Sequence, residues 1–350
     1  MTTIHDRSIT SQSSLAAQEA SADALIRSSL VCEAMLPWEC TDKSLVILDR
    51  YAACGFDFIS ITMATDDSPG DAAGDALRSI AELRCLVGSA PAKFQMVRTA
   101  ADIEHIAAAG KVGISLNFQG TLPFGKTLSL VEPFYELGVR QVLLAYNQQN
   151  FVCEGCSERT DSGLSKFGVS LVKELHRVGV LVDGTHCGYR ATMEAIEIGD
   201  GRPFIFSHSN AFSIYPHYRN IKDDQIRACA ATNGFVGING LNLFLGDIDA
   251  RAETMFNHID HIASLVGIDH VGLGLDYVQF EDPIDDYYER NPDVWPTNPY
   301  NGRPMRGIRS AQPEVLSDLV KLMLEHGYSI ESVRKVLGLN YLRVTKTVWK

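Results

Sequence analysis

The chain has 350 residues, of which 45% are hydrophobic and 21% are charged, so it can bury a large core and is typical of a folded protein. Its formal net charge of -12 and its pI near 5.3 argue against a nucleic acid or an anionic membrane as partner, because too few lysines and arginines are present to neutralise phosphates. Residues 1–22 form a polar segment without the pattern of a secretory signal, and no apolar run approaches the roughly 18 residues that span a bilayer. We therefore expect a cytoplasmic protein.

Short β-branched runs alternate along the chain with amphipathic stretches of helical length. Helical periodicity is clear in "KSLVILDRYAACG", "LSKFGVSLVKELHRVG", "DDQIRACAATNG" and "FNHIDHIASLVG", which all end at a glycine, the usual C-cap. The predicted strands span residues 30–36, 56–63, 111–118, 141–146, 180–186, 203–209, 234–240 and 270–276, with 94–98 as a ninth strand outside the main sheet.

This alternation predicts an α/β fold with parallel strands joined by helical crossovers. Eight strands favour a closed (β/α)8 TIM barrel over an open doubly wound sheet, since the glycine-rich phosphate loop of the latter is missing after the first strand. Residues 277–312 predict a long loop over the barrel mouth, and two closing helices follow at 313–327 and 329–348. We expect one barrel domain over 23–350.

In such barrels the functional side chains lie at the carboxyl ends of the strands. Two histidines at neighbouring ends and an acid on the last strand suit a divalent metal and its bound water. A structural histidine and a capping aspartate are the alternatives for these positions. The residues at these ends are Glu33, Met35, Gln119, Tyr146, His186, His208, Asn239 and Asp276.

Three stretches, "GLSKFGVSLVKELHRVGVLVDGTH", "PFIFSHSNAFSIYPHYRNIKDDQI" and "HIDHIASLVGIDHVGLGLD", resemble the renal (membrane) dipeptidases, peptidase family M19 of the amidohydrolase superfamily. The resemblance runs from about residue 23 to about residue 344. It implies a metal-dependent hydrolase barrel with a two-zinc site. It also implies that His186 and His208 bind metal, that Asp276 handles the proton of the attacking water, and that Arg219 holds the substrate carboxylate. A surface ion pair of Arg219 with Asp223 or Asp224 is the alternative.

Four positions depart from the family pattern. Glu33 and Met35 replace the histidine and aspartate of the first strand, Gln119 replaces the glutamate that bridges the two metals, and Tyr146 replaces a histidine that polarises the scissile carbonyl. A neutral amide and a thioether cannot balance two divalent charges. We therefore expect one divalent ion, zinc by preference, held by His186 and His208 with help from Glu33 or Asp276. An intact pair of ions and no metal at all are the alternatives.

The resulting hypothesis is a dipeptidase-like metallohydrolase that cleaves the amide bond of a small carboxylate-bearing substrate, with Asp276 and Tyr146 as catalytic residues and Arg219, Tyr146 and Asn239 on the substrate. The alternative is a catalytically silent relative that serves as a metal-free binding or scaffold protein. A third possibility is metal-free chemistry at Cys32 or Cys187, the cysteines nearest the rim by sequence. The family resemblance also suggests a homodimer.

Overall fold

The structure, a computed structural model, describes residues 22–66 and 70–350. Residues 1–21 of the expected polar segment lie outside that range. Eight parallel strands correspond to the eight predicted ones: β1 (Cys32–Leu36), β2 (Phe58–Thr65), β4 (Val112–Gln119), β5 (Val139–Leu143), β6 (Leu181–Asp183), β7 (Phe204–Ile205), β8 (Val236–Ile238) and β9 (Val271–Leu273). The short β3 (Phe94–Met96) pairs with β4 away from this path, as expected for 94–98.

The strands form a barrel because the two ends of the main sheet are joined through β8 and β9. Hydrogen-bonded neighbours follow the order β1-β2-β4-β5-β6-β7, and β8 pairs with β9. A parallel bridge between Phe206 and Val236 continues β7 into β8. On the other side, the Asp276 amide donates to the Met35 carbonyl at 3.3 Å and so links the end of β9 to β1. The predicted TIM barrel is confirmed.

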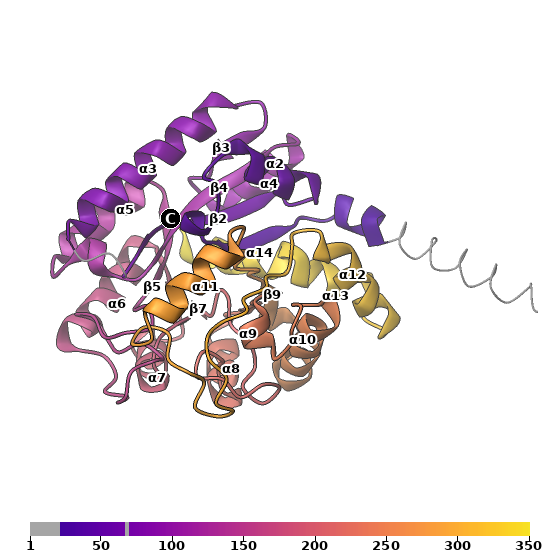
Figure 1. Ribbon diagram of the computed structural model, residues 1–350. Helices are drawn as coiled ribbons and strands as arrows, with labels where there is room; N and C mark the ends of the chain where they lie inside the picture. Colours follow the sequence, from indigo (N-terminus) through magenta and orange to yellow (C-terminus); the bar gives the residue numbers. More distant parts are fainter. Residues whose placement is uncertain (1–21, 67–69) are drawn as a thin grey trace, which may run out of the picture.

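Helices surround the strands, as Figure 1 shows. They are α2 (Leu45–Ala53), α3 (Ala72–Ser89), α4 (Ala100–Ala108), α5 (Val131–Glu136), α6 (Lys166–Val178), α7 (Tyr189–Ile198), α8 (Asp223–Ala231), α9 (Asn242–Leu245), α10 (Ala252–Val266), α11 (Glu281–Arg290), α12 (Val315–Glu325), α13 (Ile330–Arg334) and α14 (Asn340–Val348). None of the helices in 22–66 and 70–350 is both long and apolar enough to cross a membrane.

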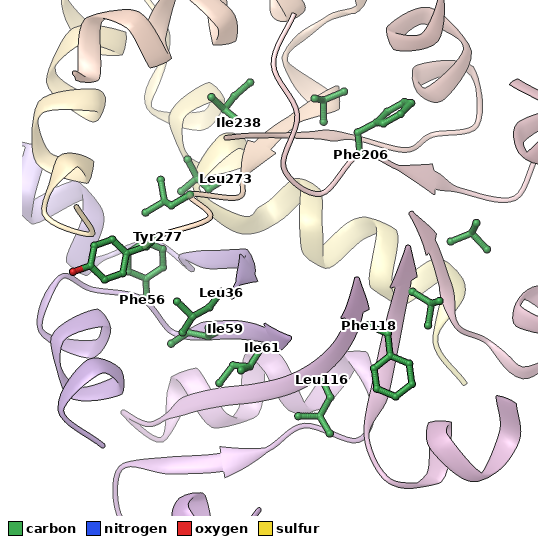
Figure 2. Close-up of a cluster of buried hydrophobic side chains, with 14 of the residues drawn as sticks. Leu36, Phe56, Ile59, Ile61, Leu116, Phe118, Phe206, Ile238, Leu273 and Tyr277 are labelled. Carbon is green, nitrogen blue, oxygen red and sulfur yellow. The ribbon is translucent and has the colours of Figure 1, made fainter. Parts of the chain in front are cut away.

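The alternation of side chains along β4 separates an apolar outer layer from a polar barrel interior. Phe118 packs its ring against Phe134 of α5, with centroids 5.0 Å apart at 80°. Figure 2 shows Phe118 with other buried apolar side chains of several strands. The residues on either side of Phe118, Asn117 and Gln119, form hydrogen bonds with the hydroxyl of Thr62 on β2. Because successive residues of a strand face opposite ways, the sequence "VGISLNFQ" builds both layers at once.

Residues 277–312 cover the barrel mouth as expected, but they are not only a loop, because they contain helix α11. The acidic residues in its first turn are favourable at a helix N-terminus. Pro283 is tolerated in this turn because backbone N–H groups there form no hydrogen bond within the helix, so the lack of an N–H costs nothing. Hydrophobic periodicity does not predict this helix, because its sequence, "EDPIDDYYER", is mostly polar. This lid packs on the rim through a separate buried apolar cluster that includes Phe244, Tyr288 and Trp295.

The last predicted helix, 329–348, is interrupted by a π-helical turn at Lys335–Leu339 between α13 and α14. Gly338 lies there against the start of β1, where an added Cβ would come within 2.4 Å of the Leu30 carbonyl oxygen. A wider turn at this point lets the helix pass close to the strand.

His258 on α10 anchors the segment that follows β7. It is fully buried, its Nδ1 accepts from the Ala211 amide at 3.1 Å, and burial lowers its pKa to about 4. Below pH 6.5 the unfolded chain therefore binds a proton that the folded chain excludes. We expect this residue to cost roughly 3 kcal/mol of unfolding free energy as the pH falls from about 6.5 to 4.

Urea unfolding at several pH values tests this expectation. H258Q should reduce the slope over that range by about one proton, because other buried histidines such as His176 keep their contribution. H105Q, at an exposed position on α4, should keep the wild-type slope. An unchanged slope in H258Q would contradict the assignment.

Candidate active site

The two histidines at the ends of β6 and β7 meet at the centre of the site. His186 and His208 are 4% and 0% exposed, and their Nε2 atoms lie 3.2 Å apart. Each outer nitrogen has an oxygen partner: His186 Nδ1 lies 2.6 Å from Asn147 Oδ1, and His208 Nδ1 lies 2.8 Å from Ser207 Oγ. If both Nδ1 atoms donate, both Nε2 lone pairs face the same point.

That spacing fits one metal ion. Two nitrogens at 2.0–2.1 Å from a tetrahedral zinc are about 3.3 Å apart, and ligand histidines donate their other N–H to an oxygen, as these two can. Burial and the nearby Arg219 charge hold the pKa of both rings well below the ordinary value, so they are in the neutral form that binds metal. Within 22–66 and 70–350, however, no three side chains of His, Cys, Asp or Glu group as a metal site.

Two site residues adopt strained backbone conformations. His186 has φ of 68° and Asp276 has φ of 55°, in the left-handed region that non-glycine residues rarely occupy. Each is buried just beyond the end of a barrel strand, where the backbone must turn to direct the side chain inward. Such strain is typical of functional positions.

Asp276 is oriented by Asn239. The amide nitrogen of Asn239 donates to Asp276 Oδ2 at 2.9 Å, and its oxygen accepts from the Leu241 backbone amide at 2.7 Å. Burial raises the pKa of Asp276 to about 6, and the Arg219 charge limits that rise. Asp276 is thus a carboxylate near neutral pH whose pKa suits a general base.

Arg219 is a buried cation rather than part of a surface ion pair. It is 3% exposed and donates to the His208 carbonyl oxygen at 3.0 Å, while its Nε has no hydrogen-bond partner among the described residues. Asp223 instead bonds to Ser213 and His261, and Asp224 accepts from Tyr189. The alternative of an ion pair with Asp223 or Asp224 is therefore wrong.

Tyr146 lies flat against His186, with ring centroids 4.1 Å apart and planes inclined by 22°. Trp295 of the lid meets the edges of both rings, at 5.7 and 6.0 Å. The lid is also tied to the site by Asn147, whose amide nitrogen donates to the Val294 carbonyl oxygen at 3.1 Å. Sequence reasoning missed Asn147 and Trp295. The position of Asn147, directly after Tyr146 in "YNQQN", is the one signal that could have found it.

The two cysteines considered for metal-free chemistry lie in different parts of the barrel. Cys32 is buried in a second apolar cluster with Phe58, Tyr341 and Trp349, at the start of β1 and away from the strand ends. Its expected place near the rim is wrong. Cys187 follows His186, but its thiol lies 3.7 Å from the carbonyl oxygens of Ala145 and Thr185.

A cavity of about 180 Å³ opens beside His186, between the loops that follow β5, β6 and β7, with Tyr300 of the lid on its wall. Its lining includes His186 and Arg219 together with Tyr218, Phe212 and Tyr300. It therefore gives a ligand access to one side of the site while the lid covers the mouth.

Comparison with known proteins identifies the family. The sequence profile of the membrane dipeptidases, peptidase family M19, matches residues 46–288. The chain belongs to this family. Dipeptidase tcpJ of Claviceps purpurea is 29% identical over 260 residues, which are 73% of this chain and 56% of that protein. An uncharacterised dipeptidase of Schizosaccharomyces pombe is 29% identical over 290 residues, or 80% and 64% of the two chains. This chain thus spans less than two thirds of either relative.

Solved structures agree with the fold. An amidohydrolase from Pseudomonas aeruginosa superposes with a TM-score of 0.83 at 27% identity, over 94% of this chain and 99% of that one. A metallopeptidase from Rhodobacter sphaeroides, liganded with a phosphinate mimic of the dipeptide L-Ala-D-Ala, gives a TM-score of 0.75 at 21% identity, over 92% and 100% of the two chains.

A family of metallopeptidases implies a divalent metal, but this M19 chain does not fit a pair of ions. Met35 accepts a hydrogen bond from Thr62 Oγ1 at its sulfur, and Gln119 donates to the same hydroxyl at 3.1 Å. Both positions therefore hold neutral groups already engaged with a neighbouring strand. Two divalent ions repel each other strongly without carboxylates between them, so the donor set suits one ion at most.

Glu33 is the remaining acid of the first strand. Its Oε1 accepts from the Met35 and Leu275 backbone amides at 3.0 and 2.9 Å, and its Oε2 has no hydrogen-bond partner among the described residues. Burial raises its pKa from the usual 4.5 to about 8, and the nearby Asp276 charge adds to the rise. Glu33 is thus mainly a neutral carboxylic acid at pH 7, which disfavours it as a ligand unless an ion displaces its proton.

Restoring carboxylates at the altered positions should restore metal capacity. We expect the double variant M35D/Q119E to bind about one zinc ion per chain more than the wild type, because two added charges offset the repulsion between ions. Elemental analysis after dialysis against zinc measures this. Q148E, which adds a charge at an exposed position, is the control. Equal zinc content in the folded double variant and the wild type would contradict this account of the site.

Proposed function

We propose that this chain hydrolyses the amide bond of dipeptide-like substrates that carry a free carboxylate, with one divalent metal ion, zinc by preference, rather than two. The 3.2 Å separation of the His186 and His208 Nε2 atoms carries the proposal, because it matches two nitrogens on one tetrahedral ion. Glu33, whose Oε2 has no hydrogen-bond partner among the described residues, would serve as the third donor only after moving toward the two histidines, since no acid of the described residues groups with them. Family membership supports the reaction class.

The remaining residues have distinct tasks. A bound ion supplies a water of lowered pKa and polarises the scissile carbonyl. Asp276, held by Asn239, accepts the proton of the attacking water and returns it to the leaving amine. Arg219 is fixed by the His208 carbonyl oxygen and binds the substrate carboxylate. Tyr146, stacked on His186, donates to the developing oxyanion as a neutral phenol.

One observation favours a second candidate, a metal-free binding protein. The two Nε2 atoms are also within hydrogen-bond distance, so one neutral imidazole can donate to the other and satisfy both without an ion. The pocket would then keep Arg219 for binding an anion without the hydrolytic step. Metal content distinguishes the two candidates.

The wild-type protein should retain about one zinc per chain and turn over members of a panel of L-L and L-D dipeptides. H208A should lose the metal, because it removes half of the paired donors, whereas H326A, at an exposed position after α12, should retain it. Elemental analysis and amine release provide the two readouts. A wild-type protein that holds no metal at any zinc concentration and cleaves no dipeptide would exclude the metallohydrolase.

Arg219 should determine the affinity for the substrate carboxylate. R219K keeps a positive charge but loses the planar fork, so we expect KM for a cleaved dipeptide to rise about tenfold or more with a smaller change in kcat. R190K, at an exposed position on α7, is the control. Steady-state kinetics in which R219K leaves KM at the wild-type value would contradict the assignment.

A further inference from the structure

Two neighbouring side chains in the cavity beside His186 have hydrogen-bonding atoms without a partner. The Nε of Arg219 and the hydroxyl oxygen of Tyr218 are both buried, and neither has a hydrogen-bond partner among the described residues. Both residues line the cavity of about 180 Å³. Buried polar groups normally have a hydrogen-bond partner, so an unsatisfied pair in residues that line one cavity indicates a ligand that reaches both atoms when it binds.

The chemistry of the pair points to an anion. Arg219 is a cation with no carboxylate in contact in the described part of the chain, and Tyr218 adds a hydroxyl that can donate. Burial raises the pKa of Tyr218 far above the ordinary value, so the phenol stays protonated. A guanidinium N–H and a phenol O–H together suit the two oxygens of a carboxylate.

The rest of the cavity restricts what can be attached to that carboxylate. Phe212 and Tyr300 meet edge to face, with centroids 4.9 Å apart, and Tyr189, the first residue of α7, also lines the cavity. Cavities of roughly 150 Å³ are large enough for benzene, so a single ring fits here. Glu158 and Asp161 also line the cavity and accept from the Gln149 and Arg190 backbone amides. The exposed Lys222 lies over the Tyr189 ring at 4.7 Å, but the two carboxylates outnumber it, which disfavours a second negative charge on the ligand.

We propose that Tyr218 shares the substrate carboxylate with Arg219 and that this cavity receives the side chain next to that carboxylate. Together with the function proposed above, on which this inference rests, the favoured substrates are dipeptides whose carboxyl-terminal residue is phenylalanine or a large apolar residue. Glycine leaves the aromatic walls empty, and aspartate or glutamate faces the carboxylates of Glu158 and Asp161.

Binding of 3-phenylpropionate, which cannot be hydrolysed, tests the inference without turnover. We expect calorimetry to show that the wild-type protein binds it more tightly than propionate, which lacks the ring, and than 3-phenylpropionamide, which lacks the charge. Y218F should weaken 3-phenylpropionate about tenfold, as expected for one hydrogen bond to a charged group. Y341F removes a hydroxyl from a buried tyrosine packed on Phe58, in the second apolar cluster, and should bind like the wild type.

The possible outcomes separate this inference from the proposed function. Equal affinity of Y218F and Y341F for 3-phenylpropionate, or no binding to the wild-type protein, would overturn the assignment of Tyr218 even if dipeptides are cleaved. Conversely, a weakened Y218F in a protein that cleaves no dipeptide would uphold the carboxylate site and reject the hydrolase. Where turnover occurs, kcat/KM for Ala-Phe should exceed that for Ala-Gly, and Y218F should lower both.

Discussion

The close approach of His186 and His208 is the contact on which the rest of the site depends. They are 22 residues apart in sequence, but parallel neighbouring strands bring their carboxyl ends together, and β6 and β7 are such neighbours. Asn147 and Ser207 then hold the outer nitrogens, so the two inner nitrogens face one another. Burial keeps both rings neutral, and this makes the pair able to share either a proton or a metal ion.

Charge balance is the basis for proposing one metal ion in this site rather than two. The residues at the altered positions, Met35 and Gln119, are neutral, and Glu33 is driven toward its neutral form by burial. What remains is a single buried cation, Arg219, near the carboxylate Asp276, whose pKa it lowers. Such a pocket can accept one further positive ion or one negative ligand, but the cost of burying charge opposes a second divalent ion.

The loops decide how a ligand reaches this centre. The lid places Trp295 against Tyr146 and His186 and so covers the barrel mouth. The cavity at Arg219 and Tyr218 lies to one side, between the loops after β5, β6 and β7 and Tyr300 of the lid. A rigid barrel that carries variable loops is the usual basis for changes of specificity in this fold. Here the aromatic side chains around the cavity come from three separate segments of the chain, represented by Tyr189, Phe212 and Tyr300.

The sequence by itself determined the barrel, its eight strands and the positions of His186, His208, Arg219 and Asp276. The alternation of strands and helices and the ends of the strands are local patterns that can be recognised in the sequence alone. It also identified the neutral residues at 35 and 119. Only the tertiary structure decided that Arg219 is buried without an ion pair, that Cys32 is remote from the rim, and that a helix and Trp295 lie in the lid. The burial of a side chain and its hydrogen-bond partners depend on residues that are distant in sequence. The pKa of Glu33 depends on its burial and on the Leu275 amide just after β9. The unpaired donors of Tyr218 and Arg219 are recognised only when all neighbouring residues are placed.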